Sequence, residues 1–413
     1  MPRSLRRGVW RALAVAGVWA VGVTGTVQPA SASNSRLEQW YFETMRVEEM
    51  WKVSTGKGIT VAVIDTGVKV DTPSLQGRAL KGLDASGLPG DETDDYSGHG
   101  TTMAELIAGT GKNGGIRGMA PSAKIIPFRI ADTERDNQEG DTNAQDSEDA
   151  IRAAADSGAQ IISMSFASEF STVSERAAVE YARSKGKLFF AGTGNNAEDG
   201  NKPQYPAAYP DVVGVAAADR TGLVADYSQH GDNVDLGAPG GIVPRWCDTT
   251  FTRYCDGSGG TSSATAIASG SAALIWSANP DWTANQVLRA MIDTAGRDWK
   301  KGTKSTYLGH GLIRPRQILL EGKGDPGAPD ISPLTNRKTT VASASPEAGK
   351  SPSAPASSQP PKGGPGGDKA VAGSREAEKA GNAGWVGPVL GGGAALLVLA
   401  GAGFLVLRKR RNA

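Results

Sequence analysis

A short stretch decides the fold class: Val61-Ala62-Val63-Ile64-Asp65-Thr66-Gly67. This apolar, β-branched run ends in a carboxylate and a glycine, as expected of a strand that is buried on both faces and reaches a turn. It belongs to a predicted strand at residues 59–64, and similar runs occur at residues 124–130, 161–165, 188–191 and 212–216. Helical runs lie between them, at residues 101–108 and 146–157. A further helix follows at 284–294, where Thr283 and Gln286 fit a capping box. This alternation predicts a doubly wound, mostly parallel α/β sheet with helices on both faces.

Asp65 lies at the carboxyl end of the first predicted strand, which is where doubly wound sheets place their active sites. Its Asp-Thr-Gly motif also occurs in aspartic proteases, but those enzymes need two such motifs that share a proton. This chain has one Asp-Thr-Gly, so the aspartic class is disfavoured.

A second motif, Ser97-Gly98-His99-Gly100-Thr101, opens a predicted helix. An imidazole at this position can act as a general base near neutral pH. The chain has 3 histidines; His310 also stands between two glycines, and His230 lies in a turn-like Ser-Gln-His-Gly. The tripeptide alone therefore does not distinguish a catalytic histidine from a surface or capping one.

A third motif, Ser258-Gly259-Gly260-Thr261-Ser262-Ser263-Ala264-Thr265-Ala266, precedes a helical run at residues 267–276. Glycines before a serine at a helix start leave its hydroxyl exposed at the positive end of the helix dipole, which favours a developing anion. Taken alone, the motif also fits a Gly/Ser-rich loop. A phosphate-binding loop is disfavoured because no Gly-Lys-Ser/Thr follows.

The three motifs occur in the order Asp, His, Ser, which is the order of the subtilisin triad. Over about residues 58–320 the sequence resembles the subtilisin-like serine proteases, or subtilases. The resemblance implies that Ser262 is the nucleophile, that His99 is the general base and then the acid, and that Asp65 orients His99. No cofactor or metal site is expected; calcium is common in the family, but no acidic loop here has a spacing that requires it.

A fourth segment, Phe189-Phe190-Ala191-Gly192-Thr193-Gly194-Asn195, resembles the family's strand that ends in the oxyanion asparagine. Asn195 would donate its side-chain amide to the oxyanion beside the N–H of Ser262, an interaction worth roughly 3–4 kcal/mol. The alternatives are a turn-forming role for Asn195 and an oxyanion role for Asn196.

Residues 165–167 resemble the segment that pairs with substrate backbone and forms one wall of the first specificity pocket. The expected substrate-binding residues are Ser165, Phe166, Ala167 and Gly192.

Several positions depart from the family pattern. After the nucleophile the family usually has Met and later Pro, where this chain has Ser263 and Ala266. Ala167 stands where glycine is common, which narrows the expected substrate cleft. After Gly-His-Gly-Thr the family usually has His, Val, Ala and Gly, and this chain has Thr102, Met103, Ala104 and Glu105. None of these changes removes a member of the triad.

Both ends of the chain indicate export. In residues 1–32, arginines precede an uncharged apolar stretch at residues 12–27, and Ala30-Ser31-Ala32 is a small-x-small cleavage site, so a signal peptide is predicted. An uncleaved membrane anchor is the alternative.

Residues 386–407 carry no charge and are long enough to cross a ~30 Å hydrocarbon core as a helix. A basic tail at residues 408–413 follows and marks the cytoplasmic side.

The predicted organisation follows from these ends. A transmembrane helix at residues 386–407 is favoured over a buried core helix, and the peptidase domain at residues 58–321 then lies outside the cell at the cell membrane. Residues 322–383, rich in Pro, Gly and Ser, cannot bury enough apolar surface to fold and are predicted to be a disordered stalk.

Residues 33–57 form an N-terminal extension. This segment is too short for a separately folding inhibitory pro-domain, because chains below ~40 residues rarely fold without staples. It is rich in large apolar side chains: Trp40, Tyr41, Phe42, Met45, Met50 and Trp51. We predict that it packs permanently against the peptidase domain; a disordered spacer and an inhibitory propeptide are the alternatives.

Composition excludes some functions. The 413 residues include 44 Lys+Arg and 43 Asp+Glu, a formal net charge of +1, so the basic excess of nucleic-acid-binding proteins is missing.

The 2 cysteines are Cys247 and Cys255. Export favours a disulfide between them, and two thiols without a nearby histidine make a poor zinc site.

The whole architecture resembles the mycosins, the subtilases attached to actinobacterial type VII secretion systems. It predicts a single-pass, membrane-anchored extracellular serine endopeptidase that cleaves protein or peptide substrates, with type VII secretion membrane components as partners. The alternative function is a structural subunit that stabilises a secretion membrane complex and whose catalysis is dispensable.

Overall fold

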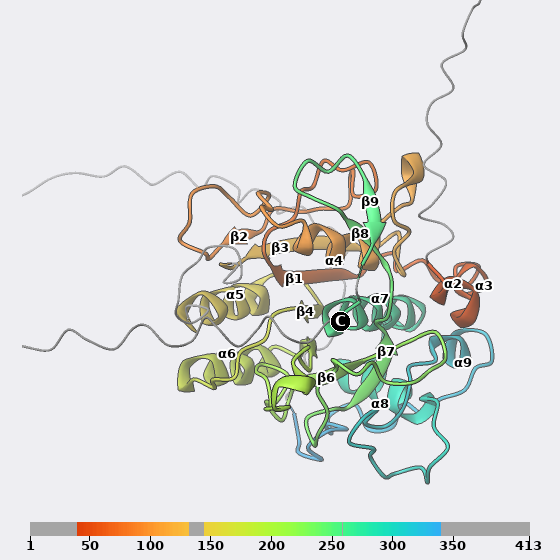
Figure 1. The fold of residues 1–413 in the computed structure, drawn as a ribbon. Coiled ribbons are helices and arrows are strands. Elements are labelled where there is room, and N and C mark those ends of the chain that lie inside the picture. The colour runs from red at the N-terminus through yellow and green to blue at the C-terminus, as the bar shows by residue number, and fades with distance from the viewer. Residues whose placement is uncertain (1–38, 132–143, 258, 340–413) are drawn as a thin grey trace, which may run out of the picture. The chain divides into compact units, whose positions relative to one another are not determined.

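A seven-stranded sheet forms the centre of the molecule (Figure 1). The computed structural model describes residues 39–131, 144–257 and 259–339. The sheet order is β2-β3-β1-β4-β5-β6-β7, and all of its pairings are parallel. The strands are β1 (Thr60–Asp65), β2 (Leu83–Asp84), β3 (Lys124–Arg129), β4 (Ile161–Met164), β5 (Leu188–Gly192), β6 (Val213–Ala218) and β7 (Leu236–Pro239).

Helices cover both faces of the sheet, because alternate side chains of each strand point to opposite faces. Val61 and Val63 of β1 belong to one apolar core, and Ala62 and Ile64 belong to the other. The first core contains α4 (His99–Ala108), α7 (Thr261–Ala278) and α8 (Ala284–Thr294). The second contains α5 (Ala144–Asp156) and α6 (Val173–Ser184). The predicted doubly wound α/β class is confirmed.

Some elements were not predicted. Strand β7 has the sequence Leu-Gly-Ala-Pro, without the β-branched residues that mark the other strands, and it forms one edge of the sheet. The antiparallel hairpin of β8 (Pro244–Trp246) and β9 (Tyr254–Asp256) was also not predicted. Two short 3₁₀ helices, η1 (Lys112–Gly114) and η2 (Ala197–Asp199), lie in loops.

The strand order places a crevice beside β1. After β1 the chain forms β2 and β3 on one side of it and later β4 on the other. A doubly wound sheet binds its ligands where the strand order reverses in this way. The carboxyl ends of three neighbouring strands meet there: β1 ends at Asp65, Ser165 follows β4, and β5 ends at Gly192.

From residue 39 onward, the N-terminal extension is part of the folded domain. It contains α2 (Tyr41–Met45) and α3 (Val47–Met50). Tyr41 is fully buried. Trp40 donates its indole N–H to the carbonyl oxygen of Ile242 at 2.9 Å, and Trp51 donates to that of Met119 at 2.7 Å. The prediction that this segment packs against the peptidase domain is confirmed for its described part, residues 39–57.

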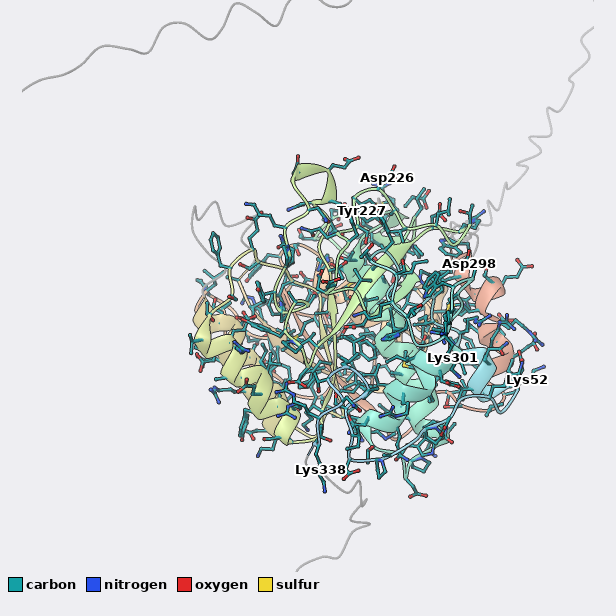
Figure 2. The ribbon with its side chains drawn as sticks, turned by 90° about the horizontal axis from the view of Figure 1, so that it is seen from below. Lys52, Asp226, Tyr227, Asp298, Lys301 and Lys338 are labelled. Carbon is teal, nitrogen blue, oxygen red and sulfur yellow. The ribbon has the colours of Figure 1, made fainter. Side chains whose placement is uncertain are left out.

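Folded structure continues past α9 (Pro315–Leu319), beyond the predicted domain end at residue 321. Thr283 and Asn285 of the α8 region both donate to the carbonyl oxygen of Pro329 at 2.9 Å, and Arg289 donates to that of Ile331 at 2.9 Å. Lys338, which is labelled in Figure 2, lies at the surface. Its side chain is 79% exposed. The prediction of disorder from residue 322 is therefore wrong for residues 322–339, because side chains of α8 bind backbone carbonyls that composition cannot reveal.

Among the residues that the structure describes, no helix combines the length and the apolar character needed to cross a bilayer. The predicted signal peptide at residues 1–32, the rest of the stalk, the membrane helix at 386–407 and the tail at 408–413 lie outside those residues. They stay predictions.

Candidate active site

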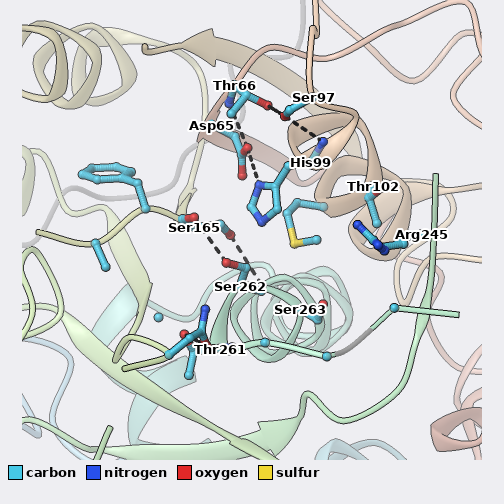
Figure 3. Close-up of a pocket in the computed structure, with 18 of the residues that line it drawn as sticks. Asp65, Thr66, Ser97, His99, Thr102, Ser165, Arg245, Thr261, Ser262 and Ser263 are labelled. Carbon is cyan, nitrogen blue, oxygen red and sulfur yellow. Dashed lines mark hydrogen bonds and ion pairs between the residues drawn. The ribbon is translucent and has the colours of Figure 1, made fainter. Parts of the chain in front are cut away.

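Asp65 and His99 lie 34 positions apart in the chain and in contact in the structure. Oδ1 of Asp65 is 2.7 Å from Nδ1 of His99. Asp65 lies at the end of β1 and is 2% exposed, and the backbone N–H of Thr66 also donates to Oδ1 at 2.8 Å. A carboxylate held in this way fixes the ring orientation of His99 and turns the other ring nitrogen away from Asp65. Figure 3 shows the His99 ring between Asp65 and Ser262.

A glycine makes this contact possible. A Cβ atom at Gly100 would lie 2.1 Å from the carbonyl oxygen of Gly67 and 3.0 Å from the Cβ of Asp65. The first turn of α4 can therefore approach β1 closely enough only without a side chain at residue 100.

Asp95 holds the start of α4 and was not identified from the sequence. Its side chain is buried, and its carboxylate accepts hydrogen bonds from the backbone N–H groups of Gly98 and Thr101, both at 2.8 Å, and from the hydroxyl of Thr66 at 2.9 Å. An anion at this place satisfies free N–H groups of the first turn and interacts favourably with the helix dipole. An acidic residue just before a predicted helix is a recognised start signal and could have revealed it.

Ser262 is the second residue of α7, a helix that is buried along most of its length. Its hydroxyl donates to the carbonyl oxygen of Ser165 at 3.3 Å. The start of α7 thereby meets the end of β4, and Ser262 lines the same cleft as Asp65 and His99. The hydroxyl stands at the positive end of the helix dipole.

Asn195 is oriented by Thr261, the residue before Ser262. Its side-chain oxygen accepts from the backbone N–H of Thr261 at 2.9 Å and from the Thr261 hydroxyl at 3.1 Å. The amide nitrogen therefore points the other way, and Asn195 lines the cleft. Asn196 also lines the cleft, but it precedes η2 and makes no such hydrogen bond to α7 within the part of the chain that the structure describes.

The end of β5 lies close against α7. A Cβ atom at Gly192 would lie 2.8 Å from the hydroxyl oxygen of Thr261. The cleft has a volume of about 510 Å³, and its walls include all four expected substrate-binding residues: Ser165, Phe166, Ala167 and Gly192.

The other two histidines do not line this cleft in the described part of the chain. The ring of His230 stacks on Tyr307, with centroids 4.5 Å apart. Burial lowers the pKa of His310 to about 4. Within the described ranges, no group of three or more His, Cys, Asp or Glu residues is placed to hold a metal ion.

The β8–β9 hairpin packs on α4 through two of the positions that depart from the family pattern. The hydroxyl of Thr102 accepts from the backbone N–H of Trp246 at 3.2 Å. Glu105 is fully buried and accepts from the hydroxyls of Tyr254 at 2.8 Å and Thr72 at 2.7 Å. Burial raises the pKa of Glu105 to about 8. Thr102 and Glu105 thus attach the hairpin to the helix that carries His99.

Cys247 and Cys255 are free thiols in the structure. In the hairpin register Arg245 pairs with Cys255, and the N–H of Cys247 donates to the carbonyl oxygen of Arg253 at 3.1 Å. The two cysteines are therefore diagonal neighbours on one face of the hairpin. Burial and the neighbouring Cys255 thiol raise the pKa of Cys247 to about 11. The disulfide stays a prediction.

Comparison with known proteins gives one family. The model of the subtilase family matches residues 56–311. Thermitase of Thermoactinomyces vulgaris is 31% identical over 274 residues, which cover 64% of this chain and 93% of thermitase.

Two solved structures are similar in fold and sequence. One is of a serine protease, MycP1, described as an essential component of the type VII (ESX-1) secretion system; it has 31% identity and a TM-score of 0.58, and the match covers 71% of this chain and 91% of that one. The other is of the MycP3 protease from the type VII (ESX-3) secretion system; it has 29% identity and a TM-score of 0.57, and the match covers 68% and 87%.

Proposed function

The chain belongs to the subtilase family of serine proteases, and we propose that Asp65, His99 and Ser262 are its catalytic triad. The observation that carries the proposal is the 2.7 Å contact of Asp65 with His99, in a cleft that Ser262 also lines. A buried carboxylate, an imidazole and a half-buried hydroxyl at a helix start that faces a cleft are the groups that acyl transfer requires.

In this mechanism the Ser262 hydroxyl attacks the carbonyl carbon of the scissile peptide bond. His99 takes the hydroxyl proton through Nε2 and then gives it to the leaving amine. Asp65 accepts the Nδ1–H of His99, which holds the ring in the productive tautomer and stabilises the imidazolium that forms. Water then hydrolyses the acyl-enzyme by the same proton transfers in reverse.

The oxyanion that develops on the substrate carbonyl oxygen is stabilised by hydrogen-bond donors next to Ser262. The amide of Asn195 and the backbone N–H of Ser262 donate to it, and the dipole of α7 adds to their effect. The role of Thr261 in binding the oxygen of Asn195 supports this assignment, because it leaves the amide nitrogen free to donate into the cleft.

For the cellular setting, we propose an exported protein that is anchored by residues 386–407, with its peptidase domain outside the cell membrane. We further propose that it works with membrane components of a type VII secretion system. The apolar and basic segments of the sequence and the two solved secretion-system proteases support this setting.

Labelling with a fluorophosphonate probe tests the chemistry. The wild type is expected to be labelled and the Ser262→Ala variant is not, while Ser184→Ala, a change on the surface helix α6, keeps labelling. Equal labelling of the Ser262→Ala variant would refute the assignment of the nucleophile.

Genetic rescue separates proteolysis from the structural alternative. A deletion strain is complemented with the wild type or with Ser262→Ala, and secretion is measured. If both restore secretion equally, the essential role is structural; rescue by the wild type alone supports proteolysis.

A further inference from the structure

Arg245 lines the active-site cleft, and the proposed mechanism does not use it. It lies in β8 of the hairpin and is exposed. It is the one lysine or arginine among the described residues of the cleft wall, and the one acidic residue there, Asp65, is bound to His99.

Arg245 lies on the far side of the catalytic residues from the specificity wall. Figure 3 shows Ser165 on one side, Arg245 on the other, and His99 and Ser262 between them. The acyl half of a substrate must lie with Ser165 and Asn195, where the oxyanion donors are. The leaving half therefore extends toward Arg245.

The arginine is supported by its own hairpin. A Cβ atom at Gly257 would lie 3.2 Å from Cδ of Arg245, so the aliphatic stem rests against the backbone that leads to the nucleophile loop. Trp246 and Tyr254 project from the opposite face and stack with ring centroids 3.9 Å apart. This stacking holds the strand that carries Arg245 in place.

The positive charge of Arg245 is not neutralised within the described chain, where it has no ion pair or hydrogen bond from its guanidinium. The hairpin has two acidic residues, Asp248 and Asp256, and neither pairs with Arg245. Asp248 accepts hydrogen bonds from Thr250 and is close to Arg253. Asp256 pairs with Pro244 in the register and so projects from the other face of the hairpin.

We propose that Arg245 determines specificity by binding a carboxylate side chain, Asp or Glu, at the first or second residue after the scissile bond. This inference rests on the proposed peptidase function. A guanidinium binds a carboxylate through two parallel N–H donors, which makes arginine suited to this recognition. The C-terminal carboxylate of a short leaving peptide has the same chemistry, so the test separates the two sources.

The test uses internally quenched peptides that share one acyl half. Peptides with Asp at the first or second residue after the scissile bond are compared with peptides that have the isosteric Asn there. All of these peptides have an amidated C-terminus. In a separate arm, an Asn peptide with a free C-terminus tests the terminal carboxylate. The wild type is expected to cleave the Asp peptides about fivefold more efficiently in kcat/KM, the upper range for exposed ion pairs. At about 1 M salt the ratio should fall toward one, because the screening length shrinks to about 3 Å.

Variants assign the effect to Arg245. The Arg245→Gln variant is expected to lose the preference for Asp over Asn, and Arg245→Glu is expected to prefer Lys over Gln at the same position. Arg253→Gln is the matched control, since Arg253 is exposed on the same hairpin but does not line the cleft. It should keep the wild-type ratio.

Equal cleavage of Asp and Asn peptides by the wild type would overturn the proposal, and so would an equal loss in the Arg253→Gln variant. A preference confined to the free C-terminus would also overturn it, because the carboxylate would not be a side chain. If the wild type cleaves no peptide, the proposed function fails; the inference is then decided by peptide affinity for the Ser262→Ala protein, where the same ratio in Kd is expected.

Discussion

Replacing Glu105 by glutamine should make the protein more resistant to alkaline unfolding. Glu105 is fully buried in α4 between the hydroxyls of Thr72 and Tyr254, and burial raises its pKa from 4.5 to about 8. Glutamine has nearly the same shape: its oxygen can accept from one of the two hydroxyls and its NH2 can donate to the other, as a protonated carboxyl group would, but it cannot ionise. The change therefore isolates the cost of the buried charge.

The direction in which stability changes with pH follows from proton binding to Glu105. Between about pH 4.5 and 8 the folded protein keeps a proton on Glu105 that the unfolded chain has released, so stability falls as the pH rises through this range. Each unit of pKa difference corresponds to roughly 1.36 kcal/mol, which gives about 5 kcal/mol as an upper bound for the whole range. Relaxation of the ionised side chain toward water reduces this value.

Urea unfolding at about pH 5 and about pH 8.5 measures the effect, in a Ser262→Ala background that prevents self-cleavage. The Glu105→Gln protein should match the parent within about 1 kcal/mol at the lower pH and exceed it by several kcal/mol at the higher one. Glu180→Gln is the matched control, because Glu180 is 59% exposed on α6 and pairs with Arg176. A stability difference between parent and Glu105→Gln that is the same at both pH values would refute this reasoning.

Four further predictions follow from the site and the fold. Asn195→Ala should lower kcat about 10²–10³-fold with little change in KM, measured by steady-state kinetics; an unchanged kcat would exclude Asn195 as an oxyanion donor. Asp95→Ala should lower kcat/KM by about tenfold and should also lower the thermal midpoint, because buried N–H groups of α4 lose their acceptor. Steady-state kinetics and calorimetry measure the two effects, and a fall in only one of these two quantities would count against this prediction. Cys247 and Cys255 should form a disulfide in the exported protein, worth about 2–3 kcal/mol; two free thiols in the mass spectrum of the unreduced protein would rule it out. Truncating residues 33–50 should lower the thermal midpoint, because the segment is part of the core; unchanged stability together with increased activity would identify it as an inhibitory propeptide instead.

Local pattern determined much of this protein. Strands buried on both faces need continuous apolar, β-branched residues, so five of the seven sheet strands could be recognised in the sequence. The capping box of α8 was also correctly predicted, because the side chains of Thr283 and Gln286 bond within a few residues of each other. The glycines around His99 stand out because Gly100 lets the start of α4 approach β1 closely. The proposed roles of Asp65, His99 and Ser262, however, came from the order of their motifs and the family resemblance, because each motif alone was ambiguous.

Only the tertiary structure decided which residues meet. The contact that favours Asn195 over Asn196 in the proposed mechanism is with Thr261, 66 positions away, and Glu105 accepts a hydrogen bond from Tyr254, 149 positions away. Neither pairing leaves a periodic signal in the chain, because each is set by how separate elements pack on the sheet. The same holds for Arg245, whose place in the cleft follows from a hairpin that α4 supports. A residue's type and spacing predict its local conformation, whereas its neighbours across the fold, and hence its chemistry, are set by long-range packing.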